Sequence, residues 1–193
     1  MNPDMVKQLR DRADRFLCGQ TPPYKLDLAC GNNKRKGFIG IDRMPINGVD
    51  IIWDLEEYPW PFVDNSVGEV YCAHFVEHVD DLIKFMNEMY RVCKNGATIH
   101  IVAPYYTSVG ASQDPTHKRF ISEQSFLYFD ANWRKQTGLT QYPILSDIRG
   151  KAIQYAWDKR LADAPNEEKE FAKAHYWNVI AEIGMVMTVV KMG

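Results

Sequence analysis

Cysteine is scarce in this sequence, and no two cysteines lie close enough to form a C-x-x-C pair. The four cysteines are Cys18, Cys30, Cys72 and Cys93. Their wide spacing argues against a structural zinc site and against a disulfide framework, and it fits a reducing compartment. A long apolar run is also missing, and the charged segment 1–15 does not have the pattern of a signal peptide. The sequence therefore predicts a cytoplasmic protein without membrane spans.

An excess of charge of either sign is also lacking. The 23 Lys and Arg residues against 25 Asp and Glu residues leave a net charge of −2. No overall field therefore draws the chain toward nucleic acid, although a local basic patch stays open. Hydrophobic residues make up 46% of the chain, which suffices for the core of a globular protein. We expect one domain over residues 1–193, with a helical extension over 1–20 and an oligomeric state that the sequence leaves open.

Predicted strands and helices alternate through the first half of the chain. Residues 4–17 carry apolar side chains at helical spacing, which predicts an amphipathic helix at the edge of the domain. Strands are predicted at 24–29, 38–41, 49–53, 69–73 and 97–103, and a further helix is predicted at 79–93. This alternation predicts a parallel sheet that is covered by helices on both faces.

The last third of the chain follows another pattern. Residues 152–161 and 177–191 are two extended runs on either side of a charged, helical segment near 166–173. Two late strands of this kind are expected to pair antiparallel at the sheet edge. The predicted fold class is α/β and Rossmann-like, with a mostly parallel central sheet, an antiparallel C-terminal edge hairpin and an N-terminal helix.

Small and acidic residues stand at the predicted strand ends, where open parallel sheets bind their ligands. The first strand ends in Asp27-Leu28-Ala29-Cys30-Gly31, whose small residues let backbone N–H groups approach a ligand. Asp42 ends the second strand and can accept hydrogen bonds from both hydroxyls of a ribose. Asp54 ends the third and suits an adenine amino group, while the N–H of Leu55 suits a ring nitrogen. His74 follows the fourth strand.

These segments resemble the class I S-adenosylmethionine (SAM) dependent methyltransferases, and in particular the type 11 group. Four pieces carry the resemblance, which spans about residues 24–130: Leu26-Asp27-Leu28-Ala29-Cys30-Gly31, Gly40-Ile41-Asp42, Pro61-Phe62-Val63-Asp64-Asn65-Ser66 and Arg91-Val92-Cys93-Lys94-Asn95-Gly96. The resemblance implies transfer of a methyl group from SAM to an acceptor, which we expect to be a small molecule. The residues assigned to the cofactor are Asp27, Ala29, Cys30, Gly31, Asp42, Arg43, Asp54, Leu55 and His74.

The first loop departs from the family pattern. Ala29 replaces a glycine that is usual in the family, which a negative φ at this residue would accommodate. The gap from Cys30 to Gly37 is too short for the usual crossover helix, so we expect one helical turn there at most. Lys34 or Arg35 would then hold the carboxylate of the cofactor.

The acceptor side is predicted in the loop after the fifth strand. This loop contains Gln113-Asp114-Pro115-Thr116-His117-Lys118-Arg119, and the two residues assigned to catalysis are His117 and Asp114. A histidine at this place can act as a general base, with Asp114 orienting the ring of His117. The alternative is a local Asx turn at Asp114, with His117 satisfied by the backbone. The aromatic residues between 120 and 142 are expected either to pack in the core or to stack on a planar acceptor. Because Lys118 and Arg119 are nearby, an anionic acceptor is a further alternative.

Three other functions compete with this interpretation. His74-Phe75-Val76-Glu77-His78 matches the H-x-x-E-H motif of zinc metallopeptidases, with His74, Glu77 and His78 in the key positions. That motif needs a long helix, whereas β-type residues lead directly into His74, so we assign no metal. A nicotinamide-binding domain is disfavoured because no G-x-G-x-x-G follows the first strand. A non-catalytic SAM-binding or partner subunit with the same fold is the main alternative.

Overall fold

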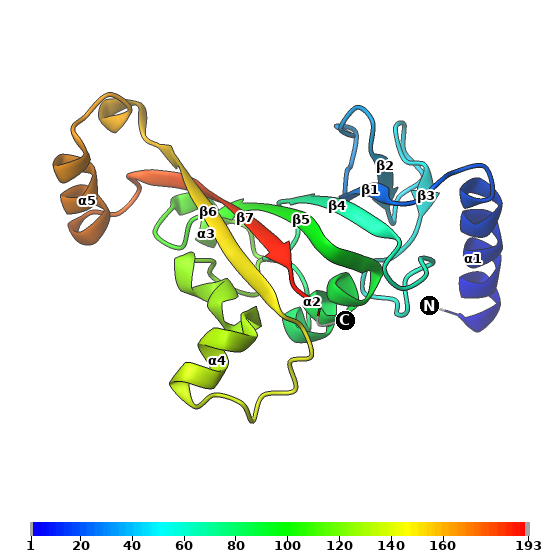
Figure 1. Cartoon of the computed structure of the whole chain (residues 1–193). Helices are drawn as coiled ribbons and strands as arrows, with labels where there is room; N and C mark the ends of the chain where they lie inside the picture. The colour runs from blue at the N-terminus through cyan, green and yellow to red at the C-terminus, as the bar shows by residue number, and fades with distance from the viewer. Residues whose placement is uncertain (1, 192–193) are drawn as a thin grey trace.

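A single twisted sheet forms the centre of the molecule (Figure 1). The computed structural model describes residues 2–191, and within them seven strands follow the order β3-β2-β1-β4-β5-β7-β6. Their bounds are Tyr24–Leu28 (β1), Ile39–Asp42 (β2), Ile51–Ile52 (β3), Val67–Ala73 (β4), Cys93–Pro104 (β5), Ile148–Trp157 (β6) and Ile180–Val189 (β7). The first five strands in this order, β3, β2, β1, β4 and β5, are parallel, while β7 pairs antiparallel with both β5 and β6. The predicted α/β fold with an antiparallel C-terminal hairpin is confirmed.

The helices lie largely where the apolar spacing predicts them. Their bounds are Pro3–Leu17 (α1), Leu82–Val92 (α2), Val109–Gln113 (α3), Ala131–Thr137 (α4) and Asn166–His175 (α5), with 3-10 turns at Glu123–Phe129 (η1) and Lys159–Leu161 (η2). Helix α1 lies beside β3 and buries Leu9 and Ala13, which confirms an amphipathic helix at the sheet edge. Helix α2 begins three residues later than predicted because the Asp81 carboxylate caps it, accepting the Lys84 N–H.

Helices cover only one face of the sheet, so the prediction that both faces are covered is wrong. Burial alternates along the central strands: Cys72 and Ile101 are fully buried, whereas their neighbours Tyr71 and His100 are half-buried on the opposite face. Helices α2 and α4 lie on the same side of the sheet (Figure 1). The reason is that the described connections between β1, β2, β3 and β4 consist of turns and loops without a crossover helix.

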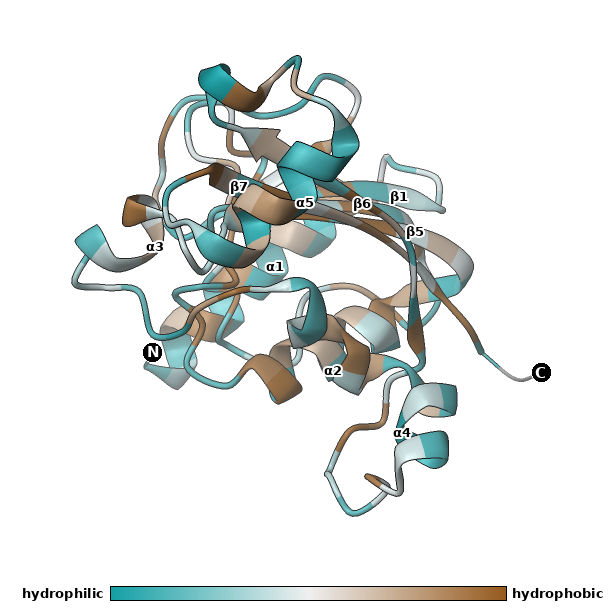
Figure 2. Cartoon of the chain, turned by 90° about the vertical axis from the view of Figure 1, so that its left-hand side faces the viewer, coloured by the Kyte–Doolittle hydropathy of each residue, from teal (hydrophilic) through white to brown (hydrophobic). Residues whose placement is uncertain are grey.

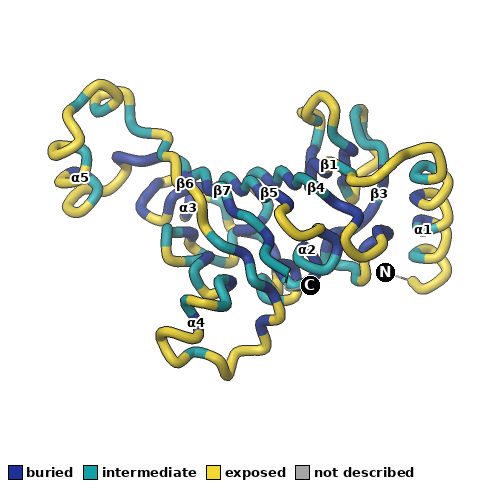
Figure 3. Tube along the Cα trace, in the orientation of Figure 1, coloured by how far each residue is buried: buried dark blue, intermediate teal, exposed yellow. Residues whose placement is uncertain are grey.

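The core lies between α2 and the covered face of the sheet. Phe85, Met86 and Met89 of α2 are fully buried, which confirms that the two methionines are core residues. Trp60 packs edge-on against Phe85 with ring centroids 5.4 Å apart. Hydrophobic residues concentrate in the central strands (Figure 2), and the same strands carry most of the buried positions, whereas α5 is largely exposed (Figure 3). The sheet is therefore a rigid base for the loops at its edge.

One charged group inside this core joins two of the sequence segments that resemble the methyltransferases. Glu88 of α2 is 8% exposed and accepts the Trp60 N–H at 2.6 Å. Arg91 donates to Glu88 at 2.7 and 2.9 Å and to Asp64 at 2.6 Å. These contacts hold the segment around residues 60–64 against α2. Arg91, the first residue of the Arg91–Gly96 segment, therefore stabilises the fold.

Removing Arg91 should therefore destabilise the fold. Arg91→Ala leaves Glu88 buried without its charge partner, and we expect the free energy of unfolding to fall by about 2 kcal/mol. Urea denaturation measures this loss. Arg12→Ala, at an exposed position of α1, is the control and should stay within about 0.5 kcal/mol of the parent chain. Equal stability of the two variants would show that the Arg91–Glu88 pair does not hold this segment.

Candidate active site

Two adjacent cavities open at the edge of the sheet where the parallel strands end. The first cavity, of about 660 Å³, lies between the turn after β4, the loop after β5 and the start of β7. The second cavity, of about 560 Å³, lies over the ends of β1 and β2 and the turn after β3. His78 lines both cavities, so they meet at this side chain.

Five of the nine residues predicted to bind a cofactor line the second cavity. They are Ala29, Asp42, Arg43, Asp54 and Leu55. Backbone N–H groups hold the carboxylate of Asp42, whose two oxygens accept from Gly31 at 3.1 Å and from Met44 at 3.0 Å. Asp54 accepts the Glu56 N–H at 3.0 Å in the same way. Both carboxylates are thus fixed at strand ends and keep further acceptor capacity for a ligand.

Asp27, Cys30 and Gly31 lie behind this cavity rather than in its lining. Asp27 is 3% exposed, and its Oδ2 accepts the Arg35 N–H at 2.7 Å, which ties down the first loop. Burial raises the pKa of Asp27, and the hydrogen bond and charge of Arg35 offset only part of that effect. Burial also raises the pKa of Cys30 to about 11, so its thiol stays protonated at neutral pH.

The backbone of Ala29 has a positive φ of 53°, against the negative value expected from its sequence. The chain reverses here so that the Cys30 N–H can donate to the Ile41 carbonyl at 3.1 Å. A left-handed alanine costs roughly 1–2 kcal/mol relative to its preferred conformations. That cost explains why glycine is usual at this position in the proteins that the segment resembles.

The short loop between Cys30 and Gly37 contains turns and no helix, in agreement with its length. Lys34 Nζ binds both oxygens of Asp50 at 2.8 and 2.9 Å, and the Arg35 guanidinium lies 3.5 Å from the ring centroid of Tyr71. Both cations are therefore engaged away from the second cavity, which they do not line. The structure does not place either side chain for the expected contact with a cofactor carboxylate.

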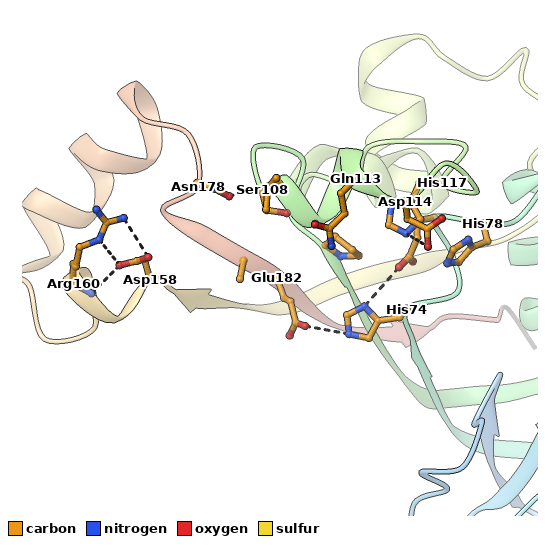
Figure 4. Close-up of a pocket in the computed structure, with 15 residues that line it drawn as sticks. His74, His78, Ser108, Gln113, Asp114, His117, Asp158, Arg160, Asn178 and Glu182 are labelled. Atoms are coloured by element: carbon orange, nitrogen blue, oxygen red, sulfur yellow. Dashed lines mark hydrogen bonds and ion pairs between the residues drawn. The ribbon is translucent and has the colours of Figure 1, made fainter.

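His74 lines the first cavity instead of the second. Its φ is 53°, and its Nδ1 lies 3.7 Å from Glu77 Oε1 while its Nε2 lies 3.2 Å from Glu182 Oε1 (Figure 4). Glu77 raises the pKa of His74 most strongly, and Glu182 adds to the effect against the opposing influence of burial. The imidazolium form of His74 is thus stabilised by carboxylates on both sides.

The loop after β5 forms one wall of the first cavity, with His117 inside it. His117 Nδ1 lies 3.1 Å from the Ala111 carbonyl, so the neutral ring donates through Nδ1 and keeps its lone pair on Nε2. Asp114 Oδ2 lies 3.9 Å from that Nε2, beyond hydrogen-bond length (Figure 4).

Asp114 is instead bound to Thr116, as the Asx-turn alternative predicts. Its Oδ1 accepts the Thr116 hydroxyl at 2.7 Å and the Thr116 N–H at 2.8 Å, and these bonds lower the pKa of Asp114. Because the hydroxyl donates to Asp114, it accepts from His78 Nδ1 at 3.0 Å. Asp114 therefore orients His78 through Thr116, while the Ala111 carbonyl orients His117.

Several lining residues were not assigned from the sequence. Glu182 and Asn178 reach the first cavity from the start of β7 and the segment before it. Because β7 is antiparallel, its first residues share an edge with the last residues of β5, as the pairing of Glu182 with Pro104 shows. This topology is the signal that would have identified them.

The aromatic residues between 120 and 142 line neither cavity. Phe126 and Phe129 are buried in the core, and Tyr128 contacts Trp133 and Tyr142. Of the two alternatives that the sequence leaves open for these side chains, core packing describes Phe126 and Phe129, whereas Phe120 is exposed and Tyr128, Trp133 and Tyr142 form a cluster of their own.

Lys118 and Arg119 are also engaged by the protein itself. Lys118 Nζ pairs with the Asp80 carboxylate, and Arg119 donates to the carbonyls of Val76 and Asp80. The two cations therefore hold the loop after β5 against the turn after β4. Their charges and hydrogen-bond donors are therefore largely used in contacts within the protein.

The helix that a zinc metallopeptidase needs around H-x-x-E-H is absent from the described chain. Residues 76–78 form a turn, and α2 starts only at Leu82. His74, at the end of β4, is thus not one helical turn away from His78 on a common face. The geometry removes the structural basis of the peptidase alternative.

A family model described as a methyltransferase domain matches residues 5–101. The chain belongs to this family. The match agrees with the sheet order and with the strand-end residues of the second cavity. The resemblance to class I SAM-dependent methyltransferases, and with it SAM as the cofactor of the family, is confirmed. No curated protein matches the chain.

Solved methyltransferases share the fold at low sequence identity. A SAM-dependent methyltransferase from Archaeoglobus fulgidus is 19% identical, with a TM-score of 0.56 over 94% of this chain and 93% of that chain. A match in a Haloferax volcanii complex of the Trm112 methyltransferase activator and a methyltransferase is 15% identical. Its TM-score is 0.53, over 97% of this chain and 93% of that chain. Geranyl diphosphate C-methyltransferase from Streptomyces coelicolor was solved with Mg²⁺, geranyl diphosphate and S-adenosyl-L-homocysteine. It is 13% identical, with a TM-score of 0.52 over 96% of this chain and 78% of that chain. In residues 2–191, no helix has both the length and the apolar character for crossing a bilayer.

The strand that presents Asp42 depends on close packing at Gly40. A Cβ atom at this position would lie 2.6 Å from Lys34 Cδ, 2.9 Å from Cys30 Sγ and 2.9 Å from the Gly48 carbonyl oxygen. We expect Gly40→Ala to lower the free energy of unfolding by about 2 kcal/mol, because the backbone carbonyl cannot move aside cheaply. Thermal unfolding measures the loss. Gly19→Ala, where a Cβ would meet nothing within 4 Å, should be close to neutral, and the same result for Gly40→Ala would contradict the packing.

Proposed function

We propose that this chain transfers the methyl group of SAM, bound in the second cavity, to an acceptor bound in the first. The observation that carries the proposal is the contact between the two cavities at His78. A methyl group can pass directly between two ligands only when their binding sites adjoin. We further propose that residues 1–193 act as one domain with 1–20 as a helical extension, and that the protein works in the cytoplasm.

The lining of the second cavity suits the nucleoside part of SAM. Asp42 is fixed by two backbone N–H groups and can accept from both ribose hydroxyls, as expected at the end of β2. Asp54 and Leu55 line the same cavity, which supports the proposed contact with the adenine edge, and Phe75 adds an apolar surface to the lining. SAM itself supplies an activated methyl group on a sulfonium ion. The protein therefore has to align the two ligands and keep water out.

The first cavity suits a small acceptor that is neutral or positively charged. Glu77, Asp114 and Glu182 place carboxylates in its lining, while the guanidinium of Arg160 is paired with Asp158. Such a surface repels phosphates and attracts amines or hydroxyl groups. It argues against the anionic acceptor that Lys118 and Arg119 suggest in the sequence. A nucleic acid substrate is disfavoured for the same reason.

His117 is the residue best placed to act on the acceptor. Its Nε2 lone pair is available because Nδ1 is bound to the Ala111 carbonyl. If the acceptor is a hydroxyl group or a protonated amine, Nε2 can take its proton as the methyl group arrives. Glu182 and His74 lie across the same cavity and are suited to binding the acceptor.

A role with a partner subunit is the second candidate. The uncovered face of the sheet favours it, because parallel strands are normally covered on both faces. One protein of the same fold is a methyltransferase solved with the Trm112 activator. A partner on this face would act alongside the two cavities rather than in place of them.

Removing the Asp42 carboxylate should weaken cofactor binding. We expect Asp42→Ala to cost about 2 kcal/mol in the affinity for S-adenosylhomocysteine, because the ribose loses a charged acceptor. Isothermal titration calorimetry measures the change. The affinity of Asp42→Asn, which keeps one carbonyl acceptor, should lie between those of the parent chain and Asp42→Ala. The control Asp11→Ala, on the exposed face of α1, should bind S-adenosylhomocysteine as the parent does. Full affinity in Asp42→Ala would mean that the ribose does not bind here.

Removing the His117 imidazole should impair transfer and spare cofactor binding. With an acceptor that must lose a proton, His117→Ala is expected to lower turnover by about 100-fold or more. A screen with labelled SAM across proteins, nucleic acids, nucleotides and small-metabolite pools finds the acceptor. Asp114→Ala tests the support that this side chain gives to His78 through Thr116. If both variants keep full turnover, the loop after β5 is only structural.

A further inference from the structure

We propose that Glu77, His78 and His117 bind a divalent transition metal ion, with Zn²⁺ the best match. The three side chains converge where the two cavities meet, and one potential ligand atom from each lies within 4.8 Å of the other two. This site shares Glu77 and His78 with the H-x-x-E-H segment, but its third ligand, His117, comes from the loop after β5, and His74 is not part of the cluster. The proposal revises the assignment from sequence, which places no metal in this chain, and it does not depend on methyl transfer.

Glu77 supplies the first argument. Its side chain is 2% exposed, and neither carboxylate oxygen has a hydrogen-bond partner among the described residues. The nearest cation, His74 Nδ1, lies 3.7 Å from Oε1, which is too far for a hydrogen bond. A buried carboxylate without donors is costly to the fold. The ring of His74, 3.7 Å away, offsets only part of that cost, and a metal ion bound directly to the carboxylate would remove more of it.

The two histidines supply the second argument. Metal-binding histidines almost always donate their other ring N–H to a backbone carbonyl, a carboxylate or a similar acceptor, which fixes the ring for the metal. His117 Nδ1 is bound to the Ala111 carbonyl at 3.1 Å. His78 Nδ1 is bound to the Thr116 hydroxyl at 3.0 Å, and that hydroxyl is held in turn by Asp114. Both rings are therefore left with Nε2 as the nitrogen that can bind a metal.

The ligand chemistry selects the kind of ion. Two imidazoles and one carboxylate form the His₂Glu set of catalytic zinc sites, in which a fourth position is left to water or another ligand. The nitrogens disfavour Mg²⁺ and Ca²⁺, which prefer oxygen ligands. At metal–ligand distances of about 2.1 Å in a tetrahedral site, two ligand atoms lie about 3.4 Å apart. The ligand atoms of this cluster lie within 4.8 Å of one another, so side-chain movements of at most about 1.4 Å close the site. All three residues line the first cavity, and the fourth position opens into it.

A bound ion would also change what happens in the first cavity. It occupies the Nε2 atom of His117 and holds an oxygen or nitrogen atom of a cavity ligand in the fourth position. A bound divalent ion lowers the pKa of a coordinated hydroxyl group or water. The ion would thus promote loss of a proton that the free His117 imidazole otherwise accepts.

Direct titration of the metal-stripped, untagged chain tests the site. Zn²⁺ should bind with a stoichiometry of one and raise the Tm, and Co²⁺ should give the visible absorption of a four- or five-coordinate site. We expect His78→Ala and His117→Ala to weaken Zn²⁺ binding by about 100-fold or more. Glu77→Gln keeps the size of the side chain and should abolish the metal-induced rise in Tm. His100→Gln, on the uncovered face of the sheet away from both cavities, is the matched control and should bind as the parent does.

Three results would overturn the proposal. They are an absence of stoichiometric Zn²⁺ binding, unchanged binding in both histidine variants, or a loss of binding that is equal in the His100→Gln control. Should Glu77→Gln fail to fold, the two histidine variants alone decide the question. S-adenosylhomocysteine binding to the metal-free chain is measured in parallel, so that failure of the metal site and failure of the cofactor site are seen separately.

Discussion

Two buried or half-buried carboxylates hold the first loop, and the second cavity depends on them. Asp27 binds the Arg35 N–H and Asp42 binds the Gly31 N–H, so the chain leaves β1, turns back and enters β2 without a helix between them. The backbone N–H groups of Gly31 and Arg35 are thus used within the protein. In the proposed function, the strand-end carboxylates that line the cavity, Asp42 and Asp54, are the main groups that would bind the nucleoside.

The short connections between the strands also affect how the faces of the sheet are covered. Without helices between β1 and β4 the sheet keeps a half-buried face along β4 and β5, and these two parallel strands alternate in burial as antiparallel strands often do. Stability then rests on the single core under α2, where Glu88 and Arg91 secure the connection before β4. The site at the sheet edge is built on strands that this one core keeps in place.

The sequence predicts the sheet well because periodicity and strand-end residues are local signals. The antiparallel hairpin, α1 and the second-cavity residues Asp42 and Asp54 follow from such signals. The positive φ of Ala29 and the convergence of His78 with His117 do not, because they depend on how distant segments meet. Glu77 shows the same limit, because the burial of its carboxylate without hydrogen-bond donors is a tertiary property.

The structure of the chain with S-adenosylhomocysteine tests the central claim most directly. The account predicts that the ribose hydroxyls bind Asp42, that the adenine lies beside Asp54, and that the sulfur atom faces His78 and the first cavity. A ligand whose sulfur atom points away from the first cavity, or that binds outside the second cavity, would contradict the account, because no acceptor near His117 could then receive the methyl group.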